Sequence, residues 1–210
     1  MRSLSLLLAA RMLPVAALAT AGWAWTSGPY APAEDRPAVA AEPKAAAVTE
    51  AEAAYDKPPS PCGVLKSQAV EELVPGADRD GKELRLTDPE RRRTCSWSAL
   101  EGYDYRWLDV GYDLRDSTAA ARSAYAARTG GSAESVDGLG EQAAVVMKLS
   151  EKDGQQSREA KLVARSGNAV VTVTYNGMDF QSESAPKADT LRDGAVQAAR
   201  AALAALPDPR

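Results

Sequence analysis

The chain has 210 residues and a formal net charge of -4, with acidic and basic residues interspersed. This charge balance argues against a nucleic-acid-binding protein, which needs a basic face to displace counterions from phosphates. The chain contains no histidine, the usual general base near neutral pH and the commonest transition-metal ligand. Catalytic triads, Cys–His pairs and His-bearing zinc sites are therefore excluded. Carboxylate, lysine or tyrosine chemistry and an all-oxygen calcium site stay open, but no catalytic constellation is visible. We expect a protein that is not an enzyme and has no cofactor.

Residues 1–27 are assigned to a signal peptide or membrane anchor, because residues 4–25 are apolar apart from Arg11 and a few small polar residues, with Arg2 before them. If Arg2 and Arg11 form a basic leader, residues 12–25 are a hydrophobic region of signal-peptide length. If the segment is not cleaved, it is long enough to span a bilayer, and Trp23 and Trp25 suit the membrane interface. Both interpretations place the rest of the chain outside the cytoplasm. We expect a single-pass membrane protein with its C-terminal domain outside, or a secreted one.

Residues 28–60 are rich in alanine, proline and glutamate and have almost no large aliphatic side chains. Such a composition cannot offset the entropy cost of ordering. The sequence predicts a disordered spacer with a root-mean-square span of about 30 Å. One domain of ordinary size is expected over residues 61–207.

The first half of this domain shows helical and strand periodicities in turn. Apolar residues at helical spacing predict a helix over 64–74, which ends at Pro75 and Gly76. A strand follows at 94–100. The clearest strand is 107–115, where apolar and polar residues alternate. Asp116 or Ser117 is expected to cap a second helix that runs to about Arg128.

The second half contains three strand-like runs and a closing helix. The runs are 142–149, 158–165 and 169–175, separated by turn residues, which predicts an antiparallel meander. An alanine-rich helix is expected over 187–206. The predicted fold is α+β: an antiparallel sheet of about five strands with helices packed on one face.

Cys62 and Cys95 are the two cysteines of the chain. In an exported protein a single pair indicates one disulfide, worth about 3–4 kcal/mol in the chain-entropy model. A redox or metal site is the competing interpretation. It is weak, because the chain lacks a Cys-x-x-Cys motif and a histidine.

Three short motifs invite a functional interpretation, and in each case a structural one is favoured. Residues 138–143 have the letters of a dinucleotide fingerprint, but a strand rather than a helix is expected after them. Ser184 and Lys187 have the spacing of a serine–lysine nucleophile pair without its partner motifs. Asp78 and Asp80 resemble the start of a calcium loop that lacks its closing glutamate.

Two sets of residues are candidate partner contacts. The basic run Arg91, Arg92 and Arg93 suits anionic headgroups or wall polymer, although a solvated approach to a strand is the commoner role. The aromatic residues concentrate in one predicted hairpin. If Trp97, Tyr105 and Trp107 lie on one face, they form a three-ring platform for a glycan, lipid or protein; otherwise Trp97 packs on the disulfide. The aromatic candidates are Tyr103, Tyr105 and Trp107.

The domain also resembles a known family. Residues 61–65 (PCGVL), 94–97 (TCSW) and 136–143 (VDGLGEQA), with the closing alanine-rich helix, are similar to an actinobacterial extracytoplasmic family, domain of unknown function 3558. The resemblance implies an envelope-associated domain with a disulfide between the two cysteines and no assigned reaction. Many members look like lipoproteins acylated at a cysteine after the signal. This chain departs from that pattern, because its first cysteine is Cys62.

Together these features predict a non-catalytic binding or interaction module at the cell envelope. Its partners would be the membrane, through the N-terminal segment, and an envelope protein, a glycan or a lipid. The alternative is a carrier that holds a small molecule or lipid between the sheet and the helices.

Overall fold

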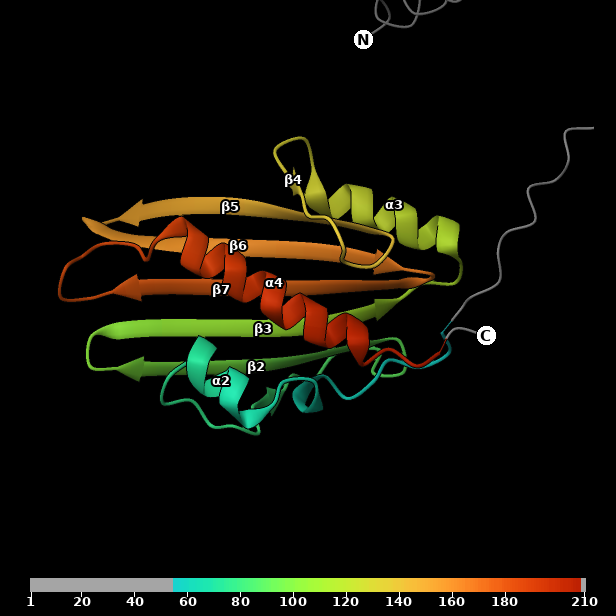
Figure 1. Ribbon diagram of the computed structural model, residues 1–210, viewed down its shortest axis with the longest axis horizontal. Coiled ribbons are helices and arrows are strands. Elements are labelled where there is room, and N and C mark those ends of the chain that lie inside the picture. Colours follow the sequence, from blue (N-terminus) through green and yellow to red (C-terminus); the bar gives the residue numbers. More distant parts are fainter. Residues whose placement is uncertain (1–54, 209–210) are drawn as a thin grey trace, which may run out of the picture. The chain divides into compact units, whose positions relative to one another are not determined.

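The computed structural model describes residues 55–208 (Figure 1). The chain divides into two units, Met1–Val48 and Thr49–Arg210. The predicted membrane segment and most of the predicted spacer therefore lie outside the described residues. Among the described residues, no helix is long and apolar enough to cross a membrane.

The described residues form one 3-10 helix, three α-helices and seven strands. In chain order they are η1 (Pro61–Gly63), α2 (Ser67–Leu73), β1 (Lys82–Glu83), β2 (Arg92–Glu101), β3 (Asp104–Leu114), α3 (Thr118–Thr129), β4 (Glu134–Ser135), β5 (Gln142–Lys152), β6 (Gln155–Ser166), β7 (Ala169–Asp179) and α4 (Ala188–Ala204).

The seven strands form one antiparallel sheet in the order β1-β2-β3-β7-β6-β5-β4. The β2–β3 hairpin and the β5–β6–β7 meander were both predicted, and β3 and β7 join them at the centre of the sheet. The α+β class is confirmed, but the count of about five strands was too low. Each of the two missed strands, β1 and β4, has two residues and pairs at a sheet edge, too short to show a period of two.

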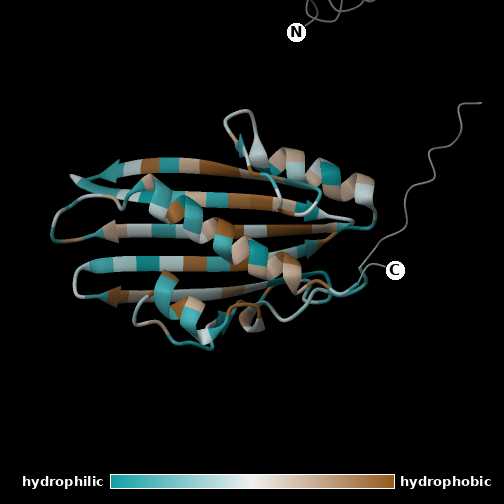
Figure 2. Ribbon diagram, in the orientation of Figure 1, coloured by the Kyte–Doolittle hydropathy of each residue, from teal (hydrophilic) through white to brown (hydrophobic). Residues whose placement is uncertain are grey.

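One face of the sheet, here called the α4 face, carries the main core. Four inward residues of α4 are fully buried there: Leu191, Ala195, Ala198 and Ala202. They lie on one stripe of the helix because residues three or four apart share a face. Figure 2 shows strongly hydrophobic bands gathered in the right-hand half of β6 and β7.

The expectation that all helices pack on one face is wrong for α3. Its Ala121 packs with Val163 and Val170, whose neighbours Leu162 and Val171 point toward the α4 side. Since alternate strand residues point to opposite faces, α3 covers the other side of the sheet. That side is here called the α3 face. β6 and β7 are apolar on both faces at this point, as strands covered on both sides are.

The disulfide joins Cys62 of η1 to Cys95 of β2, as predicted. Trp97 lies beside it: a Cβ added to Gly81 would come within 2.7 Å of both the Trp97 ring and Cys95 Sγ. Gly81 has a φ of +64°, which glycine adopts without strain. The interpretation of Trp97 as a core residue next to the disulfide agrees with this packing.

Candidate functional site

The predicted contact residues lie at opposite ends of the β2–β3 hairpin. Arg92 pairs with Asp113 near the end of β3, whereas Glu101 pairs with Asp104 at its start. These pairs are nine residues apart along β3, a distance of about 30 Å. The structure therefore does not bring the arginine run and the aromatic residues together. We call the two regions the arginine end (Arg91, Arg92, Arg93, Arg115) and the aromatic end (Leu100, Tyr103, Tyr105, Trp107, Phe180).

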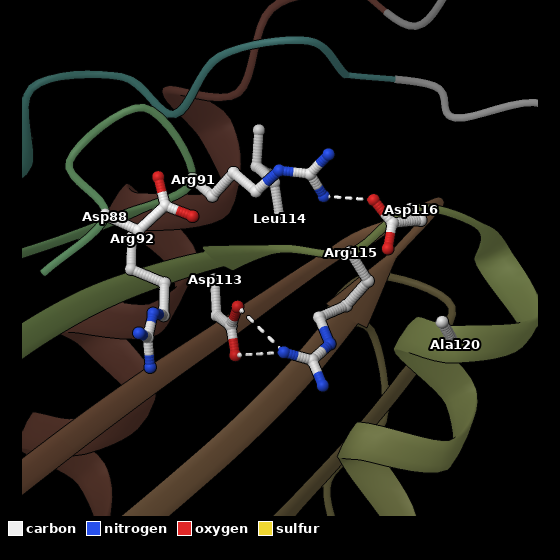
Figure 3. A pocket seen from close by; sticks show the side chains of 8 residues that line it. All are labelled: Asp88, Arg91, Arg92, Asp113, Leu114, Arg115, Asp116 and Ala120. Carbon is white, nitrogen blue, oxygen red and sulfur yellow. Dashed lines mark hydrogen bonds and ion pairs between the residues drawn. The ribbon is translucent and has the colours of Figure 1, made fainter.

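The arginine end contains a surface pocket of about 340 Å³ (Figure 3). Its charged lining is balanced, with three arginines and three aspartates. Arg91 pairs with Asp116, and Arg115 lies 3.4 Å from Asp113. The lining residues are Asp88, Arg91, Arg92, Asp113, Leu114, Arg115, Asp116 and Ala120.

Most arginine side chains at this end are engaged by carboxylates. Arg93 forms two hydrogen bonds with Glu83, of 2.6 and 2.7 Å, and this contact lowers the pKa of the Glu83 carboxyl. Arg128 of α3 also pairs with the buried Asp113. Arg92 donates to the Thr87 hydroxyl at 3.2 Å. The pocket is therefore an ion-pair network with little net charge to attract an anion.

The aromatic end presents large apolar side chains to solvent. Leu100 and Tyr103 are 58% exposed, Phe180 47% and Trp107 39%. The Phe180 amide donates to the Tyr103 carbonyl at 2.9 Å, which places the two aromatic residues at the same end of the sheet. Tyr105 pairs with Leu100 on one side and Met178 on the other. Large apolar side chains from three separate strand ends thus share one surface.

Trp97 and Trp107 point to opposite faces of the sheet. Trp97 is 1% exposed and belongs to the core of the α4 face. Trp107 alternates with buried Leu108 and so lies on the α3 face together with Tyr105. The predicted three-ring platform therefore does not include Trp97. It consists of Trp107 and Tyr105 with Tyr103 at the hairpin turn.

The Trp107 ring is held by hydrogen bonds at its polar edge. Its Nε1–H donates to Ser96 Oγ and to Asp109 Oδ1, each at 2.9 Å. Both acceptors lie on the same face, on β2 and β3. A ring fixed in this way keeps one orientation while staying exposed, so it loses little conformational entropy on binding.

Three polar residues on neighbouring strands lie in line with Trp107 across the sheet. The sequence analysis did not identify them. Trp107 pairs with Asn176 of β7, Asn176 with Glu159 of β6, and Glu159 with Lys148 of β5. We call these four residues the Trp107 row. In the sequence, the three polar residues differ in no way from other outward positions of strands in which apolar and polar residues alternate. Nothing local indicates that they share a line.

Asp104 and Asp179 are a carboxylate pair on adjacent strands, β3 and β7. Burial raises the pKa of Asp104, whereas hydrogen bonds from Ser182 lower the pKa of Asp179. Such divergence can mark an acid and a base. Here each carboxylate has a structural partner: Asp104 pairs with Arg106, and Asp179 accepts from the Gln181 and Ser182 amides of the following turn. We assign the pair to the fold.

The three motifs singled out in the sequence have structural roles. Gly140 has a φ of +59° and leads into β5, so residues 138–143 turn the chain into the sheet without a following helix. The Ser184 hydroxyl lies 2.7 Å from that of Ser182. Asp78 accepts from the Asp80 amide in a turn. Within residues 55–208, no group of three or more acidic or cysteine side chains is arranged to hold a metal ion.

Comparison with known proteins identifies no family for this chain. No family model matches it, and no curated protein matches it. A crystal structure from Bacteroides thetaiotaomicron is similar over 52% of this chain and 50% of that one, with 11% identity and a TM-score of 0.30. The match covers about half of each chain, and a similarity of this size supports no conclusion about fold or function.

Proposed function

We propose that this protein is a non-catalytic, extracytoplasmic binding module whose contact surface is the aromatic end. The N-terminal segment would tether it to the membrane or direct its secretion. The observation that carries the proposal is the exposed cluster of Tyr103, Trp107 and Phe180 at one end of the sheet. Isolated exposed apolar residues are ordinary, but several large ones on one surface are typical of interaction sites.

The arginine run contributes less to this proposal than the aromatic residues. Arg91 and Arg93 are paired with Asp116 and Glu83, and a ligand would have to replace those carboxylates. Exposed pairs of this kind are worth about 0–1 kcal/mol. They also neutralise the charge that would draw an anionic partner from a distance.

Membership of the family known as domain of unknown function 3558 is part of the proposal. It rests on the motifs PCGVL and TCSW around Cys62 and Cys95, which the disulfide joins. It is consistent with an envelope-associated domain without a reaction.

The carrier alternative receives no support from the packing between the sheet and α4. A Cβ at Gly194 would lie 2.6 Å from Tyr175 and 2.9 Å from Leu73, so helix and sheet are in direct contact there. Surface pockets of about 340, 240 and 360 Å³ are present, and α4 lines none of these three. A ligand between the layers would have to displace core side chains.

The test is co-sedimentation of the full chain with envelope fractions of the organism that encodes it. A variant carrying Tyr103→Ser, Trp107→Ala and Phe180→Ser should lose at least tenfold in bound fraction. The matched control carries Leu84→Ser and Leu86→Ser, which are exposed apolar residues outside the aromatic end. Equal loss in both variants, or no loss in either, would reject the aromatic end as the contact surface.

A further inference from the structure

The Trp107 row crosses the α3 face from β3 to β5. Neighbouring strands lie about 4.8 Å apart, so the row from Trp107 to Lys148 spans about 14 Å. A second row runs beside it, with Asp109 pairing with Thr174 and Thr174 with Lys161. The surface is therefore an extended strip with a tryptophan at one end and hydrogen-bonding groups along its length.

The exposed Trp107 ring suits the apolar side of a sugar. Its Nε1–H is satisfied by Ser96 and Asp109, so the exposed part of the ring presents an aromatic surface rather than a free donor. The π face of an aromatic ring is negative, and the C–H groups of a pyranose carry partial positive charge. Stacking of a sugar on such a ring needs no rearrangement of the protein.

The polar side chains of the Trp107 row are uncommitted. Within the described part of the chain, the side chains of Asn176, Glu159 and Lys148 form no hydrogen bond or ion pair, and neither does Lys161 of the second row. Donors and acceptors thus stand side by side along the strip. Hydroxyl groups both donate and accept, so a hydroxyl-rich ligand matches this mixture.

Charge complementarity decides which partner fits. The strip carries two carboxylates, Asp109 and Glu159, and two ammonium groups, Lys148 and Lys161, so its net charge is close to zero. An anionic lipid surface or anionic polymer would favour a basic strip instead. The strip contains lysine and glutamate side chains, and the cores of protein–protein interfaces are depleted in both residue types.

The start of the described chain lies away from the Trp107 row. Tyr55, where the described chain begins, packs against Leu114 and Ala169. Both are at the arginine end, because β3 finishes at Leu114 and β7 starts at Ala169. The described chain therefore begins at the arginine end, away from Trp107.

From these observations we infer that the strip formed by Trp107, Asn176, Glu159 and Lys148 binds an uncharged, hydroxyl-rich glycan chain. This inference rests on the proposed function and names the partner class for the surface that extends from Trp107 of the aromatic end across the sheet. Trp107 stacks on one sugar, and the polar groups of the row hydrogen-bond the sugars that follow.

The experiment separates glycan from protein and lipid in the host envelope. Binding of the full chain is measured by co-sedimentation with three preparations: the untreated envelope, the polysaccharide left after protease digestion and lipid extraction, and that polysaccharide after periodate oxidation of its vicinal diols. Vesicles of the extracted lipids form a fourth arm. Trp107→Ala and Asn176→Ala are compared with Arg85→Ala, an exposed change away from the strip.

The inference predicts binding to the stripped polysaccharide and its loss after periodate. Trp107→Ala should weaken binding at least tenfold and Asn176→Ala severalfold, with Arg85→Ala unchanged. Binding that disappears with protease or follows the lipid vesicles overturns the glycan inference but leaves the aromatic end as a contact surface. Absence of binding to every preparation overturns both. Circular dichroism of each variant establishes that it is folded.

Discussion

At the scale of single residues, Gly194 shows how closely α4 approaches the sheet. It is a glycine inside a long helix, a position where alanine normally gains about 1 kcal/mol. Because Gly194 has no side chain, the Tyr175 ring fits against the helix at this point. The Tyr175 hydroxyl donates a hydrogen bond to the Leu73 carbonyl. The ring therefore cannot move aside freely.

We predict that Gly194→Ala lowers the free energy of unfolding by about 1–2 kcal/mol, because overpacking outweighs the gain in helix propensity. Urea denaturation followed by far-UV circular dichroism measures this. Gly131→Ala is the control, since a Cβ there would meet nothing within 4 Å. A Gly194→Ala variant as stable as wild type would contradict the close packing of α4 on Tyr175.

Glu141 binds the loop before β5 to the β6–β7 turn. It accepts from the Gly167 amide at 2.6 Å and pairs at 2.7 Å with Arg165, whose side chain is 4% exposed. Hydrogen bonding from Gly167, followed by the contact with Arg165, lowers the pKa of Glu141 below the usual 4.5. The charged form is thus stabilised by the fold.

We predict that Glu141→Gln costs about 1–2 kcal/mol near neutral pH, less than a fully buried pair because Glu141 is half-exposed. A depressed carboxyl pKa contributes stability above the unfolded-state value. That contribution is lost as pH falls through the lower folded-state value. The difference between wild type and variant should therefore shrink below about pH 4.5. A difference independent of pH, or one equalled by the surface control Glu101→Gln, would reject this role.

At the scale of elements, the disulfide fastens the short N-terminal helices to the sheet. Cys62 and Cys95 are 33 residues apart, and the enclosed chain includes η1, α2 and β1. α2 has only seven residues and buries Val70 and Leu73. An isolated helix of that length is unstable in water, so its position depends on packing and on this covalent link.

The double variant Cys62→Ala, Cys95→Ala should lose about 3–4 kcal/mol of unfolding free energy but still fold around the β3–β7–α4 core. Guanidinium denaturation with and without reductant measures the loss. Reductant should destabilise the wild type by a similar amount and leave the variant unchanged. If wild-type stability does not respond to complete reduction, the disulfide does not stabilise the fold.

At the scale of the whole molecule, Tyr55 packs on the folded domain, six residues before the predicted boundary at residue 61. The Tyr55 amide donates to Asn168 Oδ1 at 2.8 Å, and Asn168 Nδ2 donates back to the Tyr55 carbonyl at 2.9 Å. Tyr55 is itself buried. The six residues before Pro61 belong to the fold because distant residues of the β6–β7 turn bind the first of them.

We predict that a chain starting at Thr49 unfolds with the full chain's free energy, whereas one starting at Pro61 loses about 2–4 kcal/mol through lost burial and hydrogen bonds of Tyr55. Thermal and urea unfolding of the two truncations give the comparison. Equal stability would show that Tyr55 contributes nothing to the domain.

Much of the fold follows from local patterns. The alternation in residues 107–115 and the helical spacing in residues 187–206 correctly identified β3 and α4. Apolar residues that recur every two positions indicate a strand with one buried face, and a period of 3.6 indicates a helix with one buried face. Turn residues located the hairpins of the meander. The single pair of cysteines in a chain expected to be exported was enough to predict the disulfide.

The tertiary structure alone decided the pairing of β3 with β7 and the placement of α3. The paired residues of these two strands are 55 or more positions apart in the sequence, and their pairing depends on the side chains buried over the whole sheet. No short stretch of sequence contains that information. That pairing sets Trp107 beside Asn176 and Glu159, and the antiparallel hairpin sends the arginine run to the other end. The sequence by itself thus determined which residues face inward, whereas long-range pairing decided which outward residues meet.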